Sequence, residues 1–452
     1  MRFLVAAFCF VALSGCARKA AVPDLGGIYD KAAMNLSADL SRNPVIVIPG
    51  VLGSRLEGPD GEIVWGEFGS GGVDPRTPEG RALLAVPADG SDDGVRATAV
   101  IERFRANLFG ITFEQSAYEN LLKTLGAGGY IDQDMSLAGD GEVNYGEDHF
   151  TCHQFPYDWR RELSTSAIKL HAFLLEKRDE IRKQRVAKFG LAAVKAAEAE
   201  HGPMKFDVVA HSMGGLVLRY YLMYGPTPLD ELGDAPTPTW AGAELVEDAI
   251  LVGTPNGGSY EAVRILAEGK RFSPLLPSYD AELLQTMPAL WQLLPVESVY
   301  PARVDGAAAN NWAYAMVYGA GLEFAEGFDM DHRFRMAEVA TKFHKSIGVD
   351  SRPPDGLRLM LFVADAKPTT DGMLADFPGG PWEVTATAPG DGTVTRRSAL
   401  MDRDPGPRLD TPIPWHRVQF LHTDHLGMTR DPGFTDNVLF LLLVDEPIRD
   451  VR

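Results

Sequence analysis

Near its middle the chain reads Phe206-Asp207-Val208-Val209-Ala210-His211-Ser212-Met213-Gly214-Gly215-Leu216, and this stretch decides the fold. The apolar run before His211 is typical of a buried β-strand, and the apolar run after Gly215 is typical of a helix. A serine at such a corner is forced into a strained conformation that raises its hydroxyl above the sheet edge. Positions two before and two after it must be small. Gly214 meets this need, while Ala210 adds a methyl where glycine is commoner. The stretch predicts a nucleophile elbow at Ser212, against the alternative of an ordinary Ser-Gly turn.

Short apolar segments alternate with amphipathic ones along much of the chain. The expected strands are residues 45–48, 206–210, 249–252 and 357–363, and the expected helices are residues 117–125, 164–200 and 216–223. This order predicts an α/β fold with a mostly parallel sheet covered by helices on both faces. Together with the elbow, it predicts an α/β-hydrolase fold over residues 43–445.

Two insertions interrupt the alternation. The first is a lid-like excursion at about residues 54–110, rich in Gly, Asp and Pro, which we expect to be irregular over residues 58–90. It contains Trp65, for which lipid contact and packing against the core both remain open. The second is a cap at about residues 259–354, where leucines and a tryptophan between Phe272 and Pro295 stand among prolines. This composition favours an irregular apolar cover over one long helix, with plain helical packing as the alternative.

A serine hydroxyl is a weak nucleophile at neutral pH and needs a base and an orienting acid. In this fold the partners follow in the order serine, acid, histidine. Asp391 lies in the turn Gly390-Asp391-Gly392-Thr393-Val394, whose glycines let a loop bring the carboxylate to the sheet edge. We therefore predict Asp391 as the acid, with Asp365, which follows an expected strand, as the alternative.

The base is expected near the C-terminal end of the chain. His425 is favoured there, with His422 as the alternative, whereas His416 precedes an expected strand and is disfavoured. Two histidines three residues apart also occur in metal sites, but no further ligand cluster supports one. We predict no metal and no cofactor.

A developing oxyanion needs backbone N–H donors, each worth about 3–4 kcal/mol in the transition state. The residue after the nucleophile, Met213, supplies one donor. The second is expected from the loop after an early strand, and the segment from Asn43 to Ser54, with its Pro49-Gly50 turn, fits that place.

The same segment begins a resemblance to the lecithin:cholesterol acyltransferase family, which includes lysosomal phospholipase/transacylase and phospholipid:diacylglycerol acyltransferases. The chain carries the family's blocks in order: Pro49-Gly50-Val51-Leu52-Gly53, Pro156-Tyr157-Asp158-Trp159-Arg160, the elbow, Gly253-Thr254-Pro255-Asn256-Gly257-Gly258, Gly390-Asp391-Gly392-Thr393-Val394 and His425-Leu426-Gly427-Met428. His422 does not match the last pattern. The resemblance implies Ser212, Asp391 and His425 as the triad, and Leu52 and Met213 as the oxyanion donors.

The resemblance also implies the reaction. A fatty acyl group passes from a phospholipid-like ester, through a serine acyl-enzyme, to an alcohol acceptor or to water, and the resemblance slightly favours transfer. A lipase or esterase for simple esters, and an inactive lipid-anchored binding protein, remain alternatives. The chain departs from the family at Ala210. It also has no cysteine at residues 58–72, where the animal enzymes close a lid with a disulfide.

The N-terminus predicts export. An apolar run from Phe3 to Leu13 ends in Leu13-Ser14-Gly15-Cys16, which resembles the lipobox of bacterial lipoproteins. We expect a signal peptide at residues 1–15, lipidation of Cys16, and a tether over residues 16–42. A plain secretory signal is the alternative. Ala17 favours the outer membrane of a Gram-negative cell. Only Cys152 then remains, so no internal disulfide is expected.

The charge excludes one class of partner. The formal net charge is −19 and the isoelectric point is about 5.0, so nucleic acid is disfavoured. An anionic membrane would repel the same surface. We therefore expect the lipid substrate and the membrane to be contacted through apolar surface or through the tether. The sequence leaves protein partners open.

Overall fold

The structure is a computed structural model that describes residues 40–69, 72–108, 111–116, 118–133, 151–271, 277–300, 303–304, 307–308, 312–318, 330–375, 382–404 and 406–445. The predicted signal peptide, the lipidation at Cys16 and most of the tether lie outside the described residues. So do residues 272–276 of the predicted cap. Within the described residues, no helix combines the length and the apolar character that crossing a bilayer requires.

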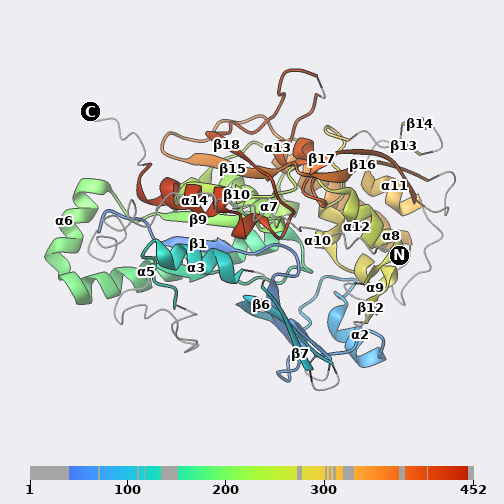
Figure 1. Ribbon diagram of the computed structural model, residues 1–452, viewed down its shortest axis with the longest axis horizontal. Helices are drawn as coiled ribbons and strands as arrows, with labels where there is room; N and C mark the ends of the chain where they lie inside the picture. Colours follow the sequence, from blue (N-terminus) through green and yellow to red (C-terminus); the bar gives the residue numbers. More distant parts are fainter. Residues whose placement is uncertain are drawn as a thin grey trace, which may run out of the picture.

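A six-stranded parallel sheet forms the core, in the order β18-β15-β10-β9-β1-β8 (Figure 1). The strands are β1 (Val45–Ile48), β8 (Cys152–Gln154), β9 (Phe206–His211), β10 (Val246–Val252), β15 (Arg358–Ala364) and β18 (Arg417–Leu421). The central strands are buried along their whole length because helices cover both faces of the sheet. The predicted α/β-hydrolase fold is confirmed.

Helices cover the sheet on both faces. On one face α3 (Glu119–Ala127) packs against α14 (Pro432–Leu443), and on the other α5 (Leu163–Phe189) packs against α7 (Met213–Tyr224) (Figure 1). The buried Leu121, Leu122 and Leu125 form the inner stripe of α3. Helix α7 is buried throughout, because α5 and α12 (Met330–Ile347) lie over it.

The sheet order places the site. The chain runs from β1 to β8 at one edge and then returns to β9 on the other side of β1. In open parallel sheets, ligands bind beyond the carboxyl ends of the strands where the order reverses. Here the reversal lies between β1 and β9, so the turn after β1 and the turn after β9 meet. Leu40 joins the core at the opposite end, where Arg185 donates to its carbonyl.

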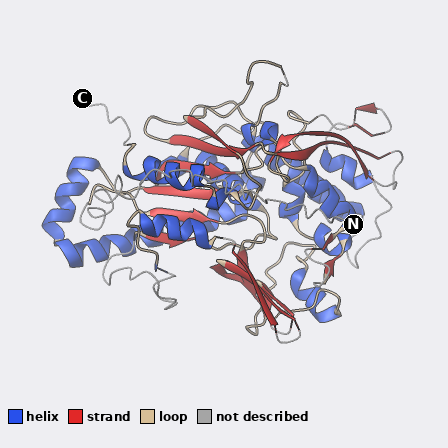
Figure 2. Ribbon diagram, viewed as in Figure 1, coloured by secondary structure: helices blue, strands red, loops and turns tan. Residues whose placement is uncertain are grey.

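The excursion after β1 is more regular than the prediction. Strands β2 (Ser54–Glu57), β3 (Ile63–Trp65) and β5 (Arg96–Val100) form one small sheet, and β4 (Glu67–Gly69), β6 (Arg103–Leu108) and β7 (Ile111–Ser116) form a second (Figure 2). Helix α2 (Pro78–Leu84) lies between β4 and β5 in the chain. Strands this short, among glycines and aspartates, leave little periodicity in the sequence, which explains the difference.

Residues 259–354 contain short helices and small hairpins. The elements are α8 (Tyr260–Glu268), β11 (Lys270–Arg271), β12 (Ser278–Tyr279), α9 (Ala281–Gln285), α10 (Pro288–Gln292), β13 (Arg303–Val304), β14 (Ala307–Ala308), α11 (Trp312–Tyr318) and α12. The described leucines and Trp291 are buried, so they serve as packing and not as an exposed cover.

A hairpin and a helix complete the architecture around the site. Strands β16 (Lys367–Ala375) and β17 (Trp382–Gly390) pair antiparallel, and β17 ends at the residue before Asp391. The short helix α13 (Arg396–Leu400) follows. Helix α6 (Leu191–His201) extends α5 away from the site (Figure 1).

Candidate active site

Ser212 stands at the corner between β9 and α7, as the elbow pattern predicts. Its backbone has φ 53° and ψ −127°, a conformation that costs a non-glycine residue about 1–3 kcal/mol. A Cβ at Gly214 would overlap the carbonyl oxygen of Pro49, and a Cβ at Gly215 would overlap the Thr254 side chain. Ala210 is fully buried, so the core accommodates its extra methyl.

The three predicted triad residues lie together. His425 Nε2 is 2.9 Å from Ser212 Oγ, and His425 Nδ1 is 2.7 Å from Asp391 Oδ2. With Nδ1 donating to the carboxylate, the lone pair of Nε2 faces the serine hydroxyl. This arrangement can take the hydroxyl proton and stabilise the imidazolium that results.

Asp391 is held firmly. Its Oδ1 accepts hydrogen bonds from the N–H groups of Thr393 at 2.8 Å and Val394 at 2.7 Å, which leaves Oδ2 for His425. The N–H of His425 also donates to the Asp391 carbonyl at 3.0 Å. Burial lowers the pKa of His425, but the charge and hydrogen bond of Asp391 outweigh it, so the pKa lies above its ordinary value.

The alternative residues lie elsewhere. Asp365 is 3.8 Å from Arg396 in an ion pair and has no hydrogen bond to a triad histidine. His422 and His416 are both exposed. The backbone N–H of His416 donates to the Leu359 carbonyl, which places it beside β15. The geometry therefore favours Asp391 over Asp365 and His425 over both other histidines.

Leu52 and Met213, which the resemblance implies as oxyanion donors, lie in the turn after β1 and at the start of α7. Gly53 N–H donates to the Gly50 carbonyl at 3.1 Å, and Leu52 sits inside this turn with φ 66°. Among the described residues, no hydrogen bond uses the Leu52 N–H. Met213 begins α7, where backbone N–H groups lack intrahelical acceptors. A Cβ at Gly50 would lie 2.7 Å from Ser212 Cβ, so this turn lies directly against Ser212.

Residues 141–314 match the sequence profile of the lecithin:cholesterol acyltransferase family. Over these residues the chain is similar to that family. Mouse phosphatidylcholine-sterol acyltransferase is 25% identical over 302 residues, which span 65% of this chain and 59% of the mouse enzyme. One chain of the Tle4–Tli4 complex has the same fold, with a TM-score of 0.53 and 14% identity over 89% of this chain and 98% of its own.

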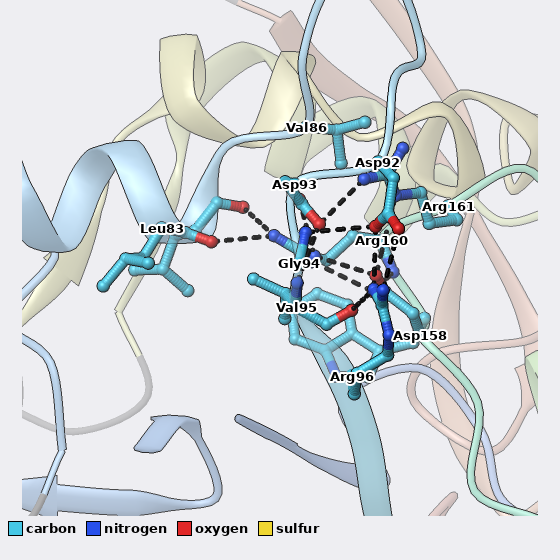
Figure 3. Close-up of polar contacts among 12 residues, drawn as sticks. Leu83, Val86, Asp92, Asp93, Gly94, Val95, Arg96, Asp158, Arg160 and Arg161 are labelled. Atoms are coloured by element: carbon cyan, nitrogen blue, oxygen red, sulfur yellow. Dashed lines mark hydrogen bonds and ion pairs between the residues drawn. The ribbon is translucent and has the colours of Figure 1, made fainter. Parts of the chain in front are cut away.

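The Pro156–Arg160 block anchors the excursion. The fully buried Arg160 donates to both carboxylate oxygens of Asp158, to Asp93, and to the carbonyls of Leu83 and Leu84 (Figure 3). Arg161 reaches the same Asp93 carboxylate at 2.9 Å. These bonds fix the end of α2 and the segment after it to the turn before α5.

The same block also supports the turn after β1. The Tyr157 hydroxyl donates to the Pro49 carbonyl at 3.0 Å, and the Trp159 indole donates to the Ser54 carbonyl at 3.3 Å. From the excursion, the Trp65 indole donates to the Leu52 carbonyl at 2.8 Å. Trp65 is only 2% exposed, which decides between its two predicted roles in favour of packing.

Sequence reasoning missed Tyr118 and His211 as members of the site. The Tyr118 hydroxyl accepts from the Gly50 N–H at 2.7 Å and lies 2.9 Å from His211 Nδ1. His211 Nε2 lies 3.2 Å from the His425 carbonyl oxygen. The only signal in the sequence is the place of His211 beside Ser212, since Tyr118 is more than ninety positions away along the chain. Within the described residues, no group of three or more His, Cys, Asp or Glu side chains is placed to bind a metal.

Proposed function

We propose that this chain is a lipid acyl hydrolase or acyltransferase that works through an acyl-enzyme on Ser212. The observation that carries the proposal is the pair of contacts from His425, to Ser212 Oγ at 2.9 Å and to Asp391 Oδ2 at 2.7 Å, at a strained elbow. A hydrogen-bonded serine, histidine and carboxylate at the carboxyl ends of a parallel sheet is the arrangement of acyl-transfer enzymes.

In the first half-reaction, His425 Nε2 takes the Ser212 proton while Oγ bonds to the carbonyl carbon of the ester. The carbonyl oxygen becomes an oxyanion, which accepts hydrogen bonds from the Leu52 and Met213 N–H groups. The tetrahedral intermediate then expels the alcohol oxygen of the donor, which receives the proton from His425. Asp391 keeps the imidazole oriented throughout.

In the second half-reaction, His425 takes a proton from water or from an alcohol acceptor. The resulting oxygen nucleophile attacks the acyl-enzyme carbonyl, the same two N–H groups bind the oxyanion, and Ser212 leaves with the proton that His425 returns. Water gives a free fatty acid, whereas an alcohol gives a new ester. The machinery is the same for both, so the acceptor decides the outcome.

A phospholipid-like ester is the proposed donor. The family match and the mouse relative, whose name specifies phosphatidylcholine and a sterol, support this choice. The half-buried Leu52 and the 49% exposed Leu426, next to the base, place apolar surface beside the site. Such surface suits an acyl chain better than a charged substrate.

Lipid product analysis tests the proposal. Purified protein with labelled phospholipid and a sterol or long-chain alcohol should yield acylated acceptor, and Ser212→Ala should yield nothing above background. Free fatty acid at every acceptor concentration would reject the transferase role and leave the hydrolase. A fluorophosphonate probe should label wild type and not Ser212→Ala. A wild type that stays unlabelled would instead support a binding protein that has lost catalysis.

The other alternative is an esterase for simple soluble esters. Efficient turnover of short-chain esters without a lipid interface would support it.

We also propose that the mature chain begins at a lipidated Cys16 and is anchored in the cell envelope, at the outer membrane. This proposal rests on the lipobox-like sequence alone. Mass spectrometry of the N-terminal peptide from membrane fractions of the native host tests it, and an unmodified Cys16 thiol would contradict it.

A further inference from the structure

One hydrogen-bonded bridge joins the turn that carries Leu52 to the backbone of the base. It runs from the Gly50 N–H through the Tyr118 hydroxyl and the His211 ring to the His425 carbonyl, with contacts of 2.7, 2.9 and 3.2 Å. Tyr118 is 5% exposed and His211 is 3% exposed, so water does not compete for these bonds. Nothing in the two half-reactions above uses either side chain.

The direction of each hydrogen bond follows from the chemistry of its ends. A backbone N–H only donates, so the Tyr118 oxygen accepts from Gly50. The hydroxyl has one proton and uses it to donate a hydrogen bond to His211 Nδ1, which must therefore carry a lone pair. Nε2 then carries the ring proton and donates to the His425 carbonyl, which can only accept. Burial, chiefly, lowers the pKa of His211 to about 3, which keeps the ring in this neutral form.

The bridge restrains His425 on its carbonyl side. On the other side, the His425 N–H donates to the Asp391 carbonyl at 3.0 Å. Both peptide groups of the base are therefore bonded, one to the loop of the acid and one to His211. The rings of His211 and His425 also pack together, with centroids 4.9 Å apart.

The bridge restrains the oxyanion turn at its other end. Gly50 opens the turn, and Leu52 lies two residues later. The Tyr118 ring also packs under this turn, since a Cβ at Gly53 would lie 2.9 Å from Tyr118 Cε2. A shift of Tyr118 would therefore move the Leu52 N–H relative to Ser212.

We infer that Tyr118 and His211 are positioning residues that hold the oxyanion turn and the catalytic base in register across the nucleophile. This inference rests on the proposed function. Neither side chain touches the reacting atoms. Tyr118 and His211 instead set the distance between the Leu52 N–H and the His425 imidazole, which must act on one carbonyl at the same time. Displacement of such groups by about 1 Å lowers the rate on the order of 100-fold.

Enzyme kinetics on three variants test the inference. Tyr118→Phe removes the hydroxyl and keeps the ring. His211→Asn keeps an acceptor near the Tyr118 hydroxyl but is too short to reach the His425 carbonyl. Each should lower kcat by about 10- to 100-fold with KM unchanged within about two-fold. Because the bridge acts as one unit, the double variant should lose no more than the worse single variant.

Tyr130→Phe is the matched control, because Tyr130 is an equally buried tyrosine whose hydroxyl has no hydrogen-bond partner among the described residues. It should leave kcat unchanged. Folded Tyr118→Phe and His211→Asn proteins with wild-type kcat would overturn the inference, and so would losses that multiply in the double variant. Neither result would affect the proposed function, which Ser212→Ala tests separately.

Nitrogen NMR of the histidine rings gives a readout that needs no activity. It can be taken on the wild-type protein, so it does not depend on how well the variants fold. In wild type and in Ser212→Ala at neutral pH, His211 should show an unprotonated Nδ1 and a protonated Nε2. Tyr118→Phe should keep the proton on Nε2, where the His425 carbonyl accepts it, and should shift the Nδ1 resonance because Nδ1 loses its hydrogen-bond donor. The opposite tautomer in wild type, or a doubly protonated ring, would refute the bridge whatever the kinetics show.

Discussion

Gly50→Ala is expected to reduce catalysis sharply while leaving the protein folded. The added Cβ would lie 2.7 Å from Ser212 Cβ and 3.3 Å from both Ser212 Oγ and the His211 carbonyl oxygen. Carbon atoms pack at about 3.5–4.0 Å, so the turn and the nucleophile must separate by about 1 Å. A displacement of this size costs on the order of 100-fold in rate, and the overpacking costs about 1–3 kcal/mol of stability.

Single-turnover acylation with a chromogenic ester measures this effect directly, because the burst reports attack by Ser212 before deacylation. The matched control is Gly233→Ala, since a Cβ at Gly233 meets no atom within 4 Å and its backbone does not require glycine. The control should acylate at the wild-type rate. A folded Gly50→Ala protein that acylates within about two-fold of wild type would refute the close approach of this turn to the nucleophile.

Three further predictions concern ionisable groups. His425 must be neutral to act as a base, and its pKa is raised, so kcat/KM should fall as the pH drops through a value above the ordinary pKa of histidine. In Asp391→Asn, the remaining activity should fall at a lower pH than in wild type. A fall at the same pH would contradict the pairing of His425 with Asp391. Arg160→Met removes the fully buried cation of this network and leaves Asp158 and Asp93 only Arg161. It should lower the free energy of unfolding in urea by about 3–5 kcal/mol, whereas a loss below about 1 kcal/mol would show that the network is dispensable. Burial, with the nearby charge of Asp248, raises the pKa of Asp207. The unfolded protein loses the proton of Asp207 once the pH exceeds the ordinary pKa of aspartate, whereas the folded protein keeps it, so Asp207 destabilises the fold increasingly as the pH rises. Asp207→Asn should therefore raise the melting temperature by more at pH 8 than at pH 5, and an advantage that shrinks with pH would contradict this sign.

The central fold was predictable because its signals are local. An apolar strand, a small-residue corner and an apolar helix leave a pattern in eleven consecutive residues, and the structure has β9, Ser212 and α7 there. Asp391 and His425 were predictable for a different reason. Each lies in a short turn whose composition and order in the chain are characteristic, although only the folded sheet brings them beside Ser212.

The supporting contacts were not predictable, because they join residues far apart in the chain. Trp65 reaches the Leu52 carbonyl across a small sheet whose strands leave almost no periodicity. Tyr118 has the sequence character of an ordinary residue on a helical face, yet its hydroxyl meets Gly50 and His211. Nothing in the residues beside Tyr118 carries information about partners that the β1 and β9 turns supply.

The core has two ends of different character. Leu40 lies near the amino ends of the strands, where Arg185 donates to its carbonyl and the Asn43 amide donates to Asp207 and Glu247. Ser212 lies at the other end of the same sheet. A support or label coupled close to Leu40 therefore attaches at the end of the sheet away from Ser212, and immobilisation there should leave the site unchanged.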